Sequence, residues 1–128
     1  MLCSIMYNIG VQSKFSAAHF HRGATESCEQ IHGHNYRVEV QIESSDLPGG
    51  DMVVDFGLVS QALSEVIEPW DHHLLNEVDD FSGIEPTTEI ICRLLYDKLS
   101  SRFSGTIFLR KVIVWETDDC WASYCPGD

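Results

Sequence analysis

Apolar and polar positions alternate in two stretches near the start of the chain. Over residues 11–19 the odd-numbered positions are mostly apolar and include Phe15, Ala17 and His19. The same alternation returns over residues 36–42. In the second stretch the intervening positions are polar or charged. A period of two is typical of a strand with one buried face. The sequence therefore predicts two strands joined by a polar loop.

The middle of the chain changes to a helical period. Asp55 is a plausible N-cap, and the apolar residues that follow have helical spacing, which predicts a first helix from about Phe56 to Ile67. A second set follows Pro86-Thr87-Thr88 and ends before Ser100-Ser101, which predicts a second helix. Its apolar residues are Ile91, Leu94, Leu95 and Leu99. The segment WDHHLLNE lies in the loop between the two helices.

Strand character returns after Gly105. The run TIFLRKVIVWET alternates and is rich in β-branched residues, and a short WASY follows the turn at Asp118-Asp119. The predicted order is therefore ββααββ. Such an order favours an α+β fold, with a four-stranded antiparallel sheet and two helices on one of its faces. We expect residues 1–128 to form one domain.

Composition limits the choice of partners and compartment. The 128 residues are 44% hydrophobic and carry a net charge of −12, so the overall field repels nucleic acids and anionic membrane surfaces. No apolar run is long enough to span a membrane, and the first residues do not resemble a signal peptide. Five cysteines without regular spacing argue against a disulfide framework. We expect a cytoplasmic protein.

Three histidines form a candidate metal site. His32 and His34 are two residues apart at the start of a predicted strand, so their side chains lie on one side of it. His19 has the parity of the buried face of the first strand. Three imidazoles would bind zinc and leave one open position, which is typical of catalytic zinc. The alternative is that these are ordinary, partly buried histidines.

Cys28 lies close to this histidine pair and has three possible roles. It could be a fourth ligand of a structural zinc, or a nucleophile or base whose thiolate is stabilised by the metal. It could also be a small hydrophobic residue, which is the usual role of an isolated cysteine.

Two further positions could take part in chemistry. Asp71 beside His72 could support acid–base catalysis, or the pair could be an N-cap followed by a surface histidine. Glu116 shares the parity of buried positions in the last long strand, where an unpaired carboxylate is unfavourable. It could pair with Lys or Arg, or accept two parallel N–H donors from a ligand such as a pterin.

The motifs occur in an order that points to a known family. They are FSAAH, C-x3-HGHNY, MVVDF, WDHHLLNE, PTTE and VIVWET. With these motifs the chain resembles the 6-pyruvoyltetrahydropterin and 6-carboxytetrahydropterin synthases over nearly its whole length. The resemblance implies the T-fold (tunnelling fold) and homohexamers of two stacked trimers, with active sites at subunit interfaces.

The resemblance also implies roles for single residues. His19, His32 and His34 match the zinc ligands, Cys28 matches the catalytic cysteine, and Asp71 and His72 match the pair that completes its triad. Glu116 matches the acid that holds the pterin ring, assisted by Thr87 and Thr88. Lys14, Arg22 and Arg37 are the cations that we expect near a substrate triphosphate.

The spacing between the cysteine and HGH separates branches of this family. Here three residues intervene, as in the carboxy-forming enzymes of queuosine biosynthesis. The resemblance thus implies conversion of 7,8-dihydroneopterin triphosphate to 6-carboxytetrahydropterin, acetaldehyde and triphosphate. The alternatives are the pyruvoyl-forming reaction, which eliminates triphosphate, and a zinc-binding module without catalysis.

Overall fold

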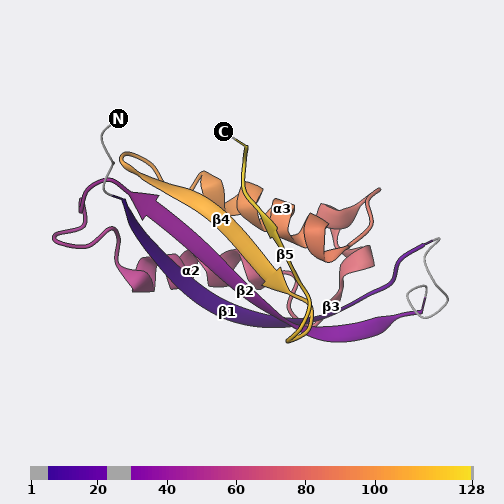
Figure 1. The fold of residues 1–128 in the computed structure, drawn as a ribbon. Coiled ribbons are helices and arrows are strands. Elements are labelled where there is room, and N and C mark those ends of the chain that lie inside the picture. Colours follow the sequence, from indigo (N-terminus) through magenta and orange to yellow (C-terminus); the bar gives the residue numbers. More distant parts are fainter. Residues whose placement is uncertain (1–5, 23–29, 128) are drawn as a thin grey trace.

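A curved sheet with two helices on one face makes up the computed structural model, which describes residues 6–22 and 30–127 (Figure 1). The long elements are β1 (Tyr7–His19), β2 (His32–Ser44), α2 (Phe56–Ile67), α3 (Thr88–Ser100), β4 (Ile107–Trp115) and β5 (Trp121–Tyr124). Their order confirms the ββααββ prediction.

The sheet has one strand more than the predicted four. The additional strand is β3 (His73–Leu74), and the order across the sheet is β3-β1-β2-β4-β5. β3 pairs with β1 in parallel over Ala17 and Ala18, whereas all the other pairs are antiparallel. Two short 3-10 helices, Leu75–Glu77 and Asp79–Phe81, follow it. A two-residue strand is too short to produce a hydrophobic period, so the sequence pattern could not indicate it.

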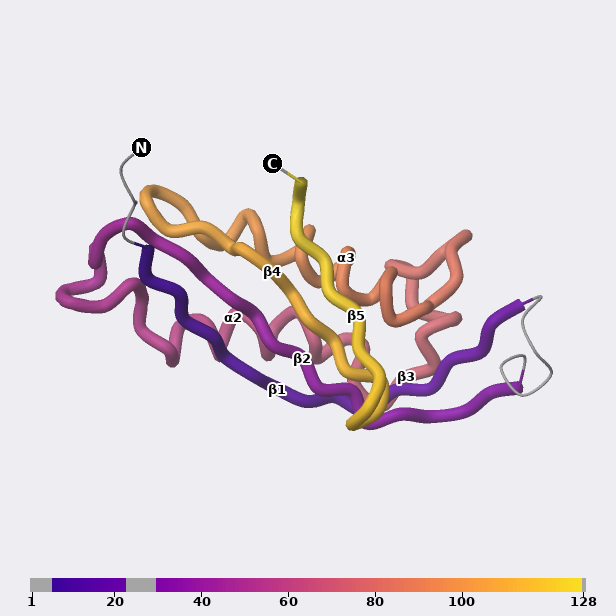
Figure 2. Tube along the Cα trace, viewed as in Figure 1, coloured from indigo at the N-terminus to yellow at the C-terminus, as the bar shows by residue number. Residues whose placement is uncertain are grey.

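The pairing of β1 with β2 brings distant parts of the chain side by side (Figure 2). Their ladder runs without a break from Tyr7 opposite Ser44 to His19 opposite His32. Phe15 and Tyr36 are cross-strand partners whose rings stack at 4.9 Å on the buried face. His19, His32 and His34 continue that same face beyond the aromatic pair.

Both helices begin at side-chain caps. Asp55 Oδ1 accepts a hydrogen bond from the Gly57 amide at 2.7 Å, and Thr87 Oγ1 accepts one from the Ile90 amide at 3.2 Å. The first helix has the predicted bounds. The buried faces of α2 and α3 pack with the inner face of the sheet in one hydrophobic core around Trp70.

In the part of the chain described by the structure, no helix is long and apolar enough to cross a membrane. Cys92, on the buried face of α3, donates its S–H to the Ala122 carbonyl, and burial raises the pKa of its thiol to about 12. That thiol is therefore protonated at neutral pH, and its environment is that of a core residue.

Candidate metal centre and ligand pocket

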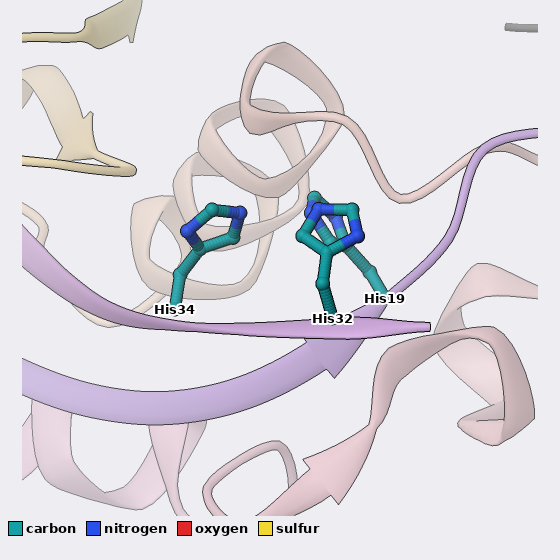
Figure 3. Close-up of side chains that lie close together, drawn as sticks. All are labelled: His19, His32 and His34. Atoms are coloured by element: carbon teal, nitrogen blue, oxygen red, sulfur yellow. The ribbon is translucent and has the colours of Figure 1, made fainter. Parts of the chain in front are cut away.

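Three imidazole rings meet at the ends of β1 and β2, beyond the aromatic core (Figure 3). Each of His19, His32 and His34 offers one nitrogen, and these three atoms all lie within 4.8 Å of one another. The register explains this grouping, because His19 is opposite His32 and Ala17 is opposite His34. Two strand ends are therefore sufficient to place all three rings.

Backbone carbonyls set the ring nitrogens that remain available. His19 Nδ1 donates to the Pro86 carbonyl and His32 Nδ1 donates to the Gln30 carbonyl, both at 2.8 Å. A carbonyl only accepts, so in the neutral rings Nε2 carries the free lone pair. Among the described residues, the buried Nε2 atoms of His19 and His34 have no hydrogen-bond partner. Unpartnered buried acceptors beside one another fit a bound metal ion.

Burial also favours the protonation state that metal binding requires. Desolvation is the largest influence on both rings, and it lowers the pKa of His19 and the pKa of His34 below the ordinary value of 6.5. The negative charge of Glu116 opposes this shift in both cases. Neutral imidazole is the form that coordinates metals, so the site is prepared for binding at neutral pH.

Glu116 follows the end of β4 and faces this cluster. Its Oε2 accepts a hydrogen bond from Thr88 Oγ1 at 2.6 Å, and its Oε1 lies 3.3 Å from His34 Nε2. Within the described ranges no Lys or Arg of this chain forms an ion pair with Glu116, and its close contact is with the imidazole of His34. A hollow of about 340 Å³ opens beside it. Its lining includes Thr88, Glu116, Cys120 and Trp121.

The two threonines expected near Glu116 have different surroundings. Thr88 is buried and holds the carboxylate directly. Thr87 caps α3, where its hydroxyl oxygen accepts a hydrogen bond from the Ile90 amide.

Asp71 and His72 form a pair on the other side of β1. His72 Nδ1 lies 3.0 Å from Asp71 Oδ1, which also accepts a hydrogen bond from the Ser16 amide. That amide is the main cause that lowers the pKa of the Asp71 carboxyl. His72 has a φ of 62°, and its side chain is 79% exposed.

His72 borders a second hollow, of about 440 Å³, with Ser16 and Asn35. This hollow shares no lining residue with the one beside Glu116. Within one chain, His72 and Glu116 therefore line different hollows, although His34 of the histidine cluster also lines the hollow beside His72. Cys28 lies outside the described residues, so its position relative to either hollow is not part of the structure.

The three cationic residues expected near the triphosphate lie at two different places in the structure. Lys14 and Arg37 are cross-strand partners whose parity is opposite to that of the histidines, on the sheet face without helices. The Arg37 guanidinium lies 4.2 Å from the centre of the Trp115 ring. Arg22 follows β1 and lies over the Phe20 ring at 5.6 Å.

Two residues of the site were not singled out from the sequence. The ring of His21 lies 4.8 Å from that of His19, and its Nε2 is buried without a partner among the described residues. Asn76 Oδ1 accepts from the Phe20 amide and its Nδ2 donates to the Phe20 carbonyl, each at 3.0 Å. The two-residue spacing between His19 and His21 was a usable signal. Asn76 gave none, because its partner is 56 residues away.

Comparison with known proteins agrees with this geometry. The profile of the 6-pyruvoyl tetrahydropterin synthase family matches residues 8–126. An Archaeoglobus fulgidus protein, provisionally named 6-carboxy-5,6,7,8-tetrahydropterin synthase, is 38% identical, with 89% of this chain and 91% of that protein covered. The Bacillus subtilis 6-carboxy-5,6,7,8-tetrahydropterin synthase is 30% identical, with 94% and 86% covered.

The fold comparison gives the same answer. The structure of Caenorhabditis elegans 6-pyruvoyl tetrahydropterin synthase superimposes with a TM-score of 0.83 at 26% identity, covering 99% of this chain and all of that one. The match confirms the predicted T-fold, which places the histidine cluster, Glu116 and the Asp-His pair on a scaffold shared with enzymes. The chain belongs to the 6-pyruvoyl tetrahydropterin synthase family of enzymes.

Proposed function

We propose that this protein is a zinc-dependent 6-carboxytetrahydropterin synthase. It would convert 7,8-dihydroneopterin triphosphate and one water molecule to 6-carboxytetrahydropterin, acetaldehyde and triphosphate, as a cytoplasmic step of queuosine biosynthesis. The observation that carries the proposal is a cluster of three histidines beside a carboxylate held by Thr88, in which the buried Nε2 atoms of His19 and His34 have no partner among the described residues. Relatives that are named for this reaction and the three-residue spacing after Cys28 support it.

His19, His32 and His34 would hold the zinc ion, which supplies Lewis-acid stabilisation of oxygen atoms on the substrate side chain. Glu116 would accept two N–H donors from the aminopyrimidinone edge of the pterin and fix the ring in the hollow beside Thr88. The pterin ring would thereby be held so that the substrate's side chain points toward the histidines.

Proton transfer would be carried out by Cys28 and His72. Cys28 as thiolate and His72 would take protons from the side-chain carbons and return protons to them. Asp71 would hold the His72 ring through Nδ1, at the 3.0 Å separation already present. The cysteine would act beside the metal and not as its ligand.

The complete site would be built from more than one copy of the chain. His72 and Glu116 line different hollows of the same chain, and the reaction would use both residues, which supports this. We propose a homohexamer of two stacked trimers, in which one copy supplies the Asp-His pair to the metal centre of another. This arrangement also gives the exposed ring of His72 a partner surface.

The reaction products test the function. Zinc-loaded protein incubated with 7,8-dihydroneopterin triphosphate should release acetaldehyde and triphosphate in equal amounts, with 6-carboxytetrahydropterin as the pterin product. A 6-pyruvoyl product without acetaldehyde would indicate the pyruvoyl-forming reaction, which is the reaction named for the C. elegans protein. Metal binding without any product would indicate a zinc-binding module.

A further inference from the structure

The two oxygens of Glu116 have separate partners. Thr88 Oγ1 holds Oε2 at 2.6 Å, so the carboxylate cannot turn freely about its last bond. Thr88 is itself buried at the first turn of α3. Oε1 is thereby directed to the histidine side and stops 3.3 Å from His34 Nε2.

This 3.3 Å contact is not a hydrogen bond. Although Oε1 is close, His34 Nε2 has no hydrogen-bond partner in the described part of the chain. In a hydrogen bond to a ring nitrogen, the partner atom lies close to the direction of the N–H bond or of the nitrogen lone pair. When two atoms bind the same metal ion, each lone pair points at the ion and not at the other atom. Ligand atoms on a tetrahedral zinc ion, each about 2.0–2.1 Å from it, are separated by about 3.4 Å. The observed separation of 3.3 Å fits two ligands of one ion.

The carboxylate is also within electrostatic range of more than one ring of the cluster. Its charge acts to raise the pKa of His19 as well as that of His34, against the larger effect of burial. It contributes in the same direction at Tyr36, whose ring is 6.1 Å from that of His19. The charge of Glu116 is therefore felt at the histidine cluster as well as in the hollow beside Thr88.

We propose that Glu116 is an exchangeable fourth ligand of the metal. In the protein without substrate, Oε1 closes the coordination shell that the three histidines leave open. A ligand with two parallel N–H donors that enters the hollow beside Thr88 takes both carboxylate oxygens and opens the fourth position. The inference rests on the proposed function, because it assumes that the histidines bind a metal and that the hollow binds an aminopyrimidinone.

The proposal adds a role to the carboxylate expected to hold the pterin ring. Glu116 would couple the binding of the pterin ring to the coordination of the metal, so that the fourth position opens only when a ring occupies the hollow. Because the coupling of two ligands is reciprocal, a ring that cannot reach the metal should weaken metal binding.

The experiment uses the full chain loaded with Co²⁺, whose visible absorption bands respond to the number and type of ligands. In Glu116→Gln, the affinity for Co²⁺ should fall by about tenfold or more, and the bands should change in intensity. Glu89→Gln is the matched control. Glu89 is exposed at the rim of the same hollow, and its substitution removes the same charge without removing a proposed ligand.

The second part of the experiment uses the protein without any mutation, so it does not depend on the folding of a variant. Pterin itself has no side chain that could reach the metal, and its addition should change the absorption bands of the bound cobalt. Lumazine, the 2,4-dioxo analogue, lacks the exocyclic amine and cannot offer both donors, so it should leave the bands unchanged.

The outcomes separate the inference from the proposed function. Equal Co²⁺ affinity in Glu116→Gln and Glu89→Gln, or pterin binding without a spectral change, would overturn the ligand role of Glu116. If the unsubstituted protein bound no Co²⁺, the proposed metal site itself would be overturned, and the inference with it.

Discussion

Among the single residues, His19 shows most clearly how the site is prepared before anything binds. Its side chain is fully buried, which is rare for histidine, and its only described ring-nitrogen contacts lie on the Nδ1 side, with the Pro86 carbonyl and the Tyr36 hydroxyl. Nε2 remains without a partner. A buried acceptor without a partner is destabilising by itself, so a bound metal should stabilise the fold.

The role of Cys28 gives a prediction at this scale. In Cys28→Ala, acetaldehyde release should fall by at least about 10²-fold, because a group that takes part in proton transfer is lost. The zinc content of the purified protein should remain one ion per chain, because three histidines are enough to hold it. Activity assays and elemental analysis of the same sample measure both quantities. Loss of zinc from this variant would show that the cysteine is a structural ligand.

The sequence pattern grouped the histidines, whereas the association of Thr88 with Glu116 came only from the family resemblance and the contact of Glu116 with His34 was not predicted. His19, His32 and His34 lie on two neighbouring strands, so parity was enough to group them. The contact of Glu116 with His34 depends on the β2–β4 register and on the position of α3, which brings Thr88 to Oε2. Such contacts join segments that are far apart in the chain, and no local pattern encodes them.

At the scale of elements, the ends of the strands determine the site. β1 ends at His19, and the chain beyond it is held by the two hydrogen bonds between Asn76 and the backbone of Phe20. Asn76 lies in the first 3-10 helix, immediately after β3. The segment between the two long helices therefore fixes the direction in which the chain leaves the histidine cluster.

Asn76→Ala tests this clamp. Loss of both hydrogen bonds should lower the free energy of unfolding by about 1–3 kcal/mol, because two backbone groups lose their partners. It should also weaken zinc binding by about tenfold, because His19 is one residue away from the released backbone. Urea unfolding and competition with a zinc chelator measure the two effects.

Gln12→Ala is a suitable control for Asn76→Ala. Gln12 lies in β1, the strand that ends at His19, and its side chain donates one hydrogen bond to Glu39. This contact is on the surface and away from the histidines. Its substitution should leave zinc affinity unchanged. Equal zinc affinities for the two variants would show that Asn76 does not position the metal ligand.

The elements themselves were largely predictable. Helix α2 has the predicted bounds because a cap and an apolar stripe specify it locally. β3 and the two short 3-10 helices were missed, since each is two or three residues long and is held by contacts with β1 and with Trp70 rather than by its own pattern.

At the scale of the whole molecule, β1 leaves one side of the sheet open. β3 covers it only at Ala17 and Ala18, so the strand from Tyr7 to Ser16 has no neighbour on that side in the described chain. Long uncovered edges pair readily with other strands. The outer face of the sheet is likewise without helices (Figure 1). Both features agree with the proposed assembly of several copies.

Mixing two inactive variants tests whether sites are shared between copies. His32→Ala should lack a metal ligand and His72→Ala should lack the acid–base ring, so each alone should be inactive. After the two are unfolded and refolded together, mixed assemblies should regain part of the activity, because some sites combine an intact half from each variant. Refolding each variant alone is the control. A mixture as inactive as its components would show that each chain supplies both halves of its own site.

The separation of the two hollows has a consequence for stoichiometry. If every chain gives its Asp-His pair to one neighbour and receives another neighbour's pair at its own metal centre, a closed ring contains as many complete sites as chains. An open row of copies would leave one metal centre without a partner at one end and one unused Asp-His pair at the other. A ring closed by rotational symmetry is then the arrangement in which every metal centre and every Asp-His pair belongs to a complete site.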